Sequence, residues 1–181
     1  KHSFYLGVGY SHEQGNIKHE KFSKVTINAS NDYKITDFLK VGFQFNGARM
    51  LPADSKQVLN ALRATPIAPV YNNEYGLYTA LPEFQKAQIN NPMVDVELKA
   101  NTTKAENYRA SGNIYGEVDF LKHFTFKAMF SMDYASNNGR TYTPIVKVYD
   151  AAVNGGISTL GTGKTEVSQF KENETKVQSD Y

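Results

Sequence analysis

The chain has 181 residues, enough for one sizeable domain, and its 20 basic and 18 acidic residues leave a net charge of only +2. Because the basic residues are scattered rather than gathered in a stripe, a nucleic-acid partner is not expected. The absence of cysteine excludes disulfides and cysteine-based metal sites, and a mean hydropathy of -0.50 excludes membrane-spanning helices.

Three strands are predicted in the first part of the chain, at residues 2–11, 21–33 and 38–49. In each of them apolar residues alternate with polar or small ones, and in the first strand the apolar positions are Phe4, Leu6, Val8 and Tyr10. A tight turn, Ile35–Phe38, joins the second strand to the third. Each strand reaches the length of about 9–11 residues that a tilted strand needs to cross a bilayer, whereas strands in soluble sandwiches more often have about 5–6.

The alternation stops at residues 50–103, which are predicted to form a long loop. A short helix is expected over Asp54–Arg63, after which Pro66 and Pro69 favour an extended path. A connection of about fifty residues is unusual in a compact domain and is usually functional where it occurs.

A second hairpin is predicted from strands at 106–119 and 123–136, joined by the tight turn Phe120–His123. A second long loop is then expected at 137–176, and no finishing strand is expected in the polar stretch Lys171–Tyr181. Tight turns on one side and long loops on the other are typical of outer-membrane barrels, in which the tight turns face the periplasm. The alternation along the strands also fits one sheet of a soluble β-sandwich.

Motifs for catalysis are weak in this sequence. Gly161–Thr165 resembles the end of a phosphate-binding loop, but Ser158 stands where that motif needs glycine, and the following residues are mostly polar. The carboxylates Glu117, Asp119 and Asp133 alternate onto the polar faces of their strands, where a hydrated barrel lumen explains them more simply than a pair of glycosidase carboxylates does. Since no arrangement of a nucleophile and a base can be recognised, the sequence does not predict an enzyme.

Two histidines, His12 and His19, flank the first loop, and each precedes a glutamate. A helical zinc protease places two histidines four residues apart on one helix face, a spacing that these two do not have. They are therefore expected to be solvated loop residues. Neither a metal site nor a bound cofactor is predicted.

Five segments, taken together, resemble one protein family. The five segments are Asp32–Gly42, Leu62–Tyr71, Asn90–Pro92, Gly112–Lys127 and Arg140–Pro144. They occur in order, with family-like spacing and over most of the chain, and they resemble segments of the SusC/RagA family of TonB-linked outer-membrane proteins. The first and fourth segments are similar to two hairpins of the family, and the others to its extracellular loops. The plug domain, the TonB box and the carboxy-terminal strand of the family have no counterpart in this sequence.

The resemblance implies an all-β fold, as a fragment of a large antiparallel transmembrane β-barrel of about 22 strands when complete, with short periplasmic turns and long extracellular loops. Residues 1–181 would be a mid-barrel segment in the outer membrane of a Gram-negative cell, surrounded by its lipid. Five or six strands cannot close a barrel, because about eight are the fewest that do so. The implied function is import of oligosaccharides or peptides together with a SusD-like surface lipoprotein, with TonB acting through the plug.

The loop at 50–103 is where contact with the ligand or the lipoprotein lid is expected. Its tyrosines Tyr71, Tyr75 and Tyr78 could stack on sugar rings, although packing within the loop is the more ordinary explanation for them. The alternative hypothesis is a soluble or surface-attached β-sandwich that binds glycans or proteins. A sandwich predicts about seven short strands with turns every 8–12 residues, a rhythm that the long loop interrupts.

Overall fold

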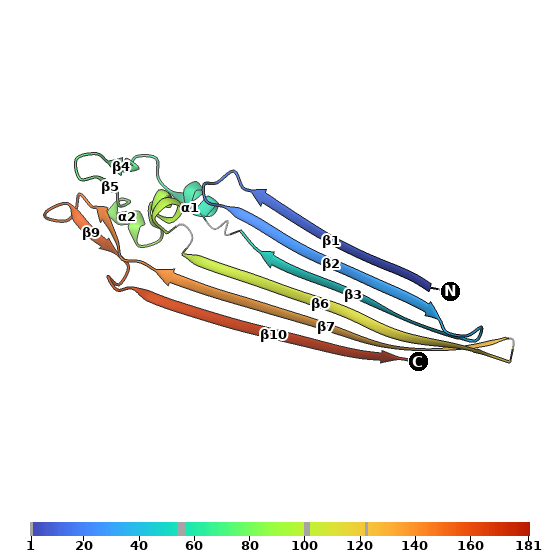
Figure 1. Cartoon of the computed structure of the whole chain (residues 1–181). Helices are drawn as coiled ribbons and strands as arrows, with labels where there is room; N and C mark the ends of the chain where they lie inside the picture. Colours follow the sequence, from blue (N-terminus) through green and yellow to red (C-terminus); the bar gives the residue numbers. More distant parts are fainter. Residues whose placement is uncertain (1, 54–56, 100–101, 122) are drawn as a thin grey trace.

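The computed structural model of the chain describes residues 2–53, 57–99, 102–121 and 123–181. Six long strands form one antiparallel sheet in the order β1-β2-β3-β6-β7-β10 (Figure 1). Their bounds are His2–Gln14 (β1), Lys21–Lys34 (β2), Leu39–Leu51 (β3), Thr103–Phe120 (β6), Phe124–Thr143 (β7) and Glu166–Asp180 (β10). The edge strands β1 and β10 do not pair with each other, so the described sheet is open.

The short elements lie beyond one end of this sheet, within the two long loops (Figure 1). They are α1 (Gln57–Arg63), β4 (Tyr71–Asn72), β5 (Leu77–Tyr78), α2 (Glu83–Lys86), the π-helical turn η1 (Val94–Leu98), β8 (Val146–Tyr149) and β9 (Ile157–Leu160). We call the described residues of 52–102 and 144–165 together the loop cap. The tight turns lie at the opposite end of the sheet. No helix in the described part of the chain is long and apolar enough to span a membrane.

The strand register gives the sheet one apolar face and one polar face. Residues that pair across antiparallel strands carry their side chains on the same face. One row across all six strands consists of Leu6, Ala29, Phe45, Gly112, Met132 and Val177. The adjacent row, on the other face, consists of Tyr5, Ser30, Gln44, Asn113, Ser131 and Gln178. Because residues two apart along a strand share a face, this segregation continues along the sheet.

The apolar face is free of Lys, Arg, Asp and Glu over most of its described length. This uncharged band extends from the tight turns to the row that contains Val8, Ile27 and Tyr134. Its side chains are exposed, as the relative exposures of 74% for Val8 and 46% for Phe130 illustrate. An apolar surface that covers a whole sheet is far larger than soluble monomers tolerate, which indicates that lipid or protein covers it.

The polar face carries a contact that spans three strands. Tyr115 of β6 donates a hydrogen bond to Asp32 of β2 across Gly42 of the intervening strand β3. A Cβ atom at position 42 would lie 2.6 Å from Asp32 Oδ1 and 2.6 Å from the Tyr115 ring, so this contact needs glycine there. The carboxylates Glu117 and Asp119 lie on the same polar face as Tyr115, since they follow it at two-residue steps along β6.

The predicted end of the second hairpin and the predicted second loop are wrong. β7 continues to Thr143 instead of ending near residue 136, and β10 begins at Glu166, within the region expected to be loop at 137–176, and continues to Asp180 through the polar stretch after it, so the loop itself spans only 144–165. All residues of β10 are exposed, and the strand forms because its backbone pairs with β7 from Glu166 to Asp180. Since backbone pairing does not require apolar side chains, β10 shows little hydrophobic alternation in the sequence.

Two other predictions need adjustment. The helix expected over Asp54–Arg63 is observed from Gln57 to Arg63, and residues 54–56 lie outside the described residues. In the described residues, no second large sheet packs on the apolar face, because the two remaining sheets have two strands each and belong to the loop cap. The described chain therefore does not form the β-sandwich of the alternative hypothesis, in which two sheets stack over a shared core.

Candidate functional site

The loop cap is the candidate functional site, and its two loops pack into one unit. Val94 from the first loop and Val146 and Val148 from the second are buried against one another, with relative exposures of 0%, 5% and 1%. Tyr78, Ala80 and Leu160 pack around this core. The loops are thus held in a defined shape by a small apolar core of their own, separate from the sheet.

Backbone contacts join the same two loops. Thr79 and Tyr149 form a parallel bridge, and the Ala80 amide donates a hydrogen bond to the Tyr149 carbonyl at 2.6 Å. The buried Asn91 side chain donates to the carbonyls of Val70 (2.8 Å) and Thr79 (2.9 Å), and its oxygen accepts from the Met93 amide at 3.1 Å. With all three bonds made, Asn91 fixes the path of the first loop; an unpaired buried polar group there would cost about 1–3 kcal/mol.

An ion pair also links the two loops. Lys86 of α2 lies 3.3 Å from Asp150 of the second loop and also contacts Glu83 of its own helix. The pKa of Lys86 is raised, first by the hydrogen bond with Glu83 and then by that with Asp150, so the ammonium group stays charged. Asp150 is buried and accepts a second bond, from the Ala152 amide at 3.0 Å.

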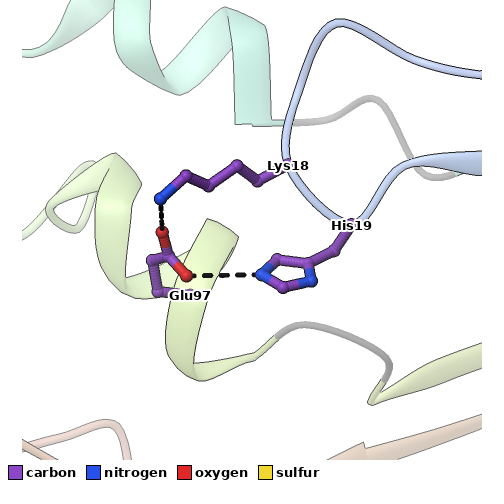
Figure 2. Close-up of polar contacts among 3 residues, drawn as sticks. All are labelled: Lys18, His19 and Glu97. Atoms are coloured by element: carbon purple, nitrogen blue, oxygen red, sulfur yellow. Dashed lines mark hydrogen bonds and ion pairs between the residues drawn. The ribbon is translucent and has the colours of Figure 1, made fainter.

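The loop between β1 and β2 is attached to the cap through Glu97 of η1 (Figure 2). Lys18 Nζ donates to Glu97 Oε1 at 2.7 Å, and His19 Nε2 lies 3.3 Å from Glu97 Oε2. These hydrogen bonds, the one from Lys18 first, lower the pKa of Glu97, and Glu97 in turn raises the pKa of Lys18. His19 is therefore not the purely solvated loop residue that its sequence context predicts, because its ring contacts a carboxylate of the cap. His12 hydrogen-bonds Ser23 at 2.8 Å.

The three predicted ligand tyrosines all lie in the cap but do not form one cluster. Tyr71 and Tyr78 are partners across β4 and β5, with ring centroids 5.2 Å apart in an edge-to-face arrangement. Tyr75 instead packs against Tyr149, at 4.9 Å between centroids. Tyr71 and Tyr75 keep 44% and 41% of their surface exposed, whereas Tyr78 packs against the valine core.

A cleft of about 250 Å³ lies between the two loops, beside the ion pair of Lys86 and Asp150. Its wall combines apolar and polar groups, among them Leu81, Asn90, Val148 and Thr159. The volume is below the range of about 300–1,000 Å³ typical of sites for drug-sized ligands, so the cleft is suited to one small part of a larger polar ligand.

Sequence reasoning missed the residues that assemble the cap, namely Asn91, Glu97 and Asp150. Each of them acts on a partner far away in the sequence, and Lys18 and Glu97 are separated by 79 residues. The only local signal is the Asn90–Pro92 turn, which marks the position of Asn91 without indicating its hydrogen-bond partners.

No family model matches the chain. The chain is similar to TonB-dependent receptor P26 of Formosa agariphila, with 25% identity over 145 residues; these are 78% of this chain and 14% of that protein. The similarity relates the chain, distantly and over this part only, to the TonB-dependent receptors. These are outer-membrane transporters and not enzymes, and their barrels are built from antiparallel strands like those of the described sheet.

Proposed function

We propose that the chain is a wall segment of a SusC-like TonB-dependent transporter in the outer membrane of a Gram-negative cell. The observation that carries the proposal is the division of the sheet into an uncharged apolar face and a polar face. A transmembrane barrel strand needs this division, because one side contacts lipid and the other contacts a hydrated lumen. In this arrangement the tight turns face the periplasm and the loop cap faces the outside of the cell.

The complete barrel would have about 22 strands and a plugged lumen. Residues 50–103, which contribute most of the cap, and the second loop would then be extracellular and would contact the ligand or a SusD-like lipoprotein lid. The half-exposed rings of Tyr71 and Tyr75 support a role in binding, because tyrosine combines a broad apolar surface with a polar tip. The polar cleft beside Lys86 and Asp150 supports the same role. The proposed cargo is an oligosaccharide or a peptide, moved by TonB acting on the plug without chemical conversion.

The test uses the complete protein in its own cells. We expect it in the outer-membrane fraction, extractable only with detergent, with an intact mass on the order of 100 kDa for about 22 strands and a plug. Deleting its gene should abolish uptake of a labelled oligosaccharide or peptide, and disabling TonB should have the same effect. Recovery of the protein in the soluble fraction without detergent would contradict the proposal.

The lipoprotein partner needs a separate test. A photo-crosslinking residue at Phe84 of the cap, which is 70% exposed, should capture a lipid-anchored protein on intact cells. The same residue at Ile35, in the β2–β3 tight turn, should not capture it, because that turn would face the periplasm. Equal capture from both positions would contradict the assignment of the lid to the cap.

A further inference from the structure

Charged side chains on the apolar face occur only at its cap end. Along the six described strands, the face carries five basic residues and one acidic residue, Glu106, and the basic ones are Lys21, Arg49, Lys104, Arg140 and Lys171. They occupy the rows directly beyond the uncharged band. At the tight-turn end, the face carries aromatic residues such as Phe120 and Phe124 instead. The charge of this face is therefore positive at one end only.

The single carboxylate is already engaged. Glu106 accepts hydrogen bonds from Arg49 Nη2 at 3.0 Å and from the Tyr108 hydroxyl at 2.6 Å. The guanidinium of Arg49 also lies over the Tyr108 ring, 5.7 Å from its centroid. Glu106 and Arg49 thus balance each other, and the positive charge that remains is concentrated farther along the rim.

Lys104, Arg140 and Lys171 form what we call the basic cluster, on the neighbouring strands β6, β7 and β10. Lys104 and Arg140 are direct cross-strand partners, and Lys171 pairs with Asn138, two residues from Arg140. All three side chains are exposed, and within the described residues none of them forms an ion pair. Like charges placed directly opposite each other destabilise a sheet, so a bound anion would relieve repulsion here.

We propose that the basic cluster binds the phosphate group of an anionic lipid in the leaflet at the cap end. This inference rests on the proposed function, since it takes the apolar face to contact lipid. The cluster lies on the cap side of apolar side chains such as Met132 and Tyr134 that would contact the acyl chains, with the small polar residues Ser136 and Asn138 between them and Arg140 on the same face of β7. Arginine matches phosphate with two parallel hydrogen bonds, and the two lysines add compact positive charge.

The test compares two triple variants of the complete protein in nanodiscs of phosphatidylcholine mixed with phosphatidic acid. The first, Lys104→Gln with Arg140→Gln and Lys171→Gln, removes the cluster. The control, Arg109→Gln with Lys127→Gln and Lys176→Gln, removes one basic residue from each of the same three strands on the polar face. Native mass spectrometry measures which lipid each protein retains after release from the nanodisc.

We expect the wild-type protein and the control to retain phosphatidic acid in preference to phosphatidylcholine. Each basic residue near a membrane surface strengthens binding of an anionic lipid roughly fivefold, so the cluster variant should lose about a hundredfold in this preference. Equal losses in both variants would overturn the proposal, because net charge alone would then explain the binding. A wild-type protein that inserts without any lipid preference would also overturn it, showing that the cluster only anchors the barrel at the interface. A wild-type protein that does not enter nanodiscs at all would instead contradict the proposed function.

Discussion

Lys18 of the β1–β2 loop donates a hydrogen bond to Glu97 of the π-helical turn η1 at 2.7 Å, across 79 residues of chain (Figure 2). This contact, with that of His19, attaches the loop between the first two strands to the cap. The cap end of β1 is therefore positioned by more than its pairing with β2, since the loop that follows it is also held by the cap.

Replacing Glu97 should release the β1–β2 loop. Glu97→Gln removes the charge and keeps the shape of the side chain. In the wild-type protein the Gly15 and Glu20 amides form hydrogen bonds within the β1–β2 loop, and we expect them to exchange hydrogen faster in the variant. The stability of the sheet should not change, because an ion pair that is exposed to solvent and weakened by salt contributes little to stability. Glu74→Gln, a neutralisation at an exposed position of the cap, is the control and should exchange like the wild-type protein.

The same contact should depend on pH. The pKa of Glu97 is held below its ordinary value of 4.5, so its contribution is fully present above that value and is lost as the pH falls through the lowered pKa. The protection of the Gly15 and Glu20 amides, measured relative to the intrinsic exchange rate at each pH, should therefore fall only at pH values below 4.5. A loss of protection that begins near neutral pH would show that Glu97 does not govern the attachment.

A lysine placed on the apolar face of β7 should destabilise the protein far more than a lysine placed on its polar face. Phe130 lies on the apolar face in the middle of the uncharged band, and Ser131 lies next to it on the polar face. Phe130→Lys should destabilise the folded protein in lipid by about 2–4 kcal/mol, the cost of lysine at the bilayer midplane, whereas Ser131→Lys should cost little. Urea unfolding in lipid vesicles measures the difference. Equal effects of the two substitutions would contradict the assignment of the faces.

Two glycines should respond with opposite signs to an added methyl group. Gly42→Ala places a Cβ atom 2.6 Å from Asp32 Oδ1, so the hydrogen bond from Tyr115 must shift or break, at about 1 kcal/mol. At Gly116 nothing lies within 4 Å of the added atom, and alanine is favoured over glycine in a strand by roughly 0.5–1 kcal/mol. Gly116→Ala should thus stabilise the protein in the same unfolding measurement, and destabilisation by both would contradict this account.

The long strands could be predicted because period-two alternation is a local property of the sequence. Residues such as Leu6 and Phe45 reveal their face from their neighbours alone, and the register then places them in one row. β10 could not be predicted in this way, because it is held by backbone pairing with β7 and has few apolar residues. Its position in the sheet depends on a partner strand and not on its own composition.

The cap could be located but not built from the sequence. The loss of alternation after Met50 marks a long loop, and its tyrosines mark candidate contacts. The contacts that shape it, such as those of Asn91 with Val70 and Thr79, join positions with no shared local pattern. The contacts between the loops, such as that of Lys86 with Asp150, become visible only when the valine core has brought the two loops together.

Within the cap, Tyr75 and Tyr78 should separate ligand binding from stability. Tyr78 packs against the core of Val94, Val146 and Val148, so Tyr78→Ala should loosen the cap by about 2 kcal/mol, as expected for a partly buried aromatic ring. Tyr75 is 41% exposed and contacts Tyr149, so Tyr75→Ala should leave the fold intact and raise the ligand concentration needed for half-maximal uptake. Hydrogen exchange across β5 and β8 reports the stability of the cap, and uptake in whole cells reports binding. If Tyr75→Ala changes neither uptake nor exchange, Tyr75 does not contact the ligand.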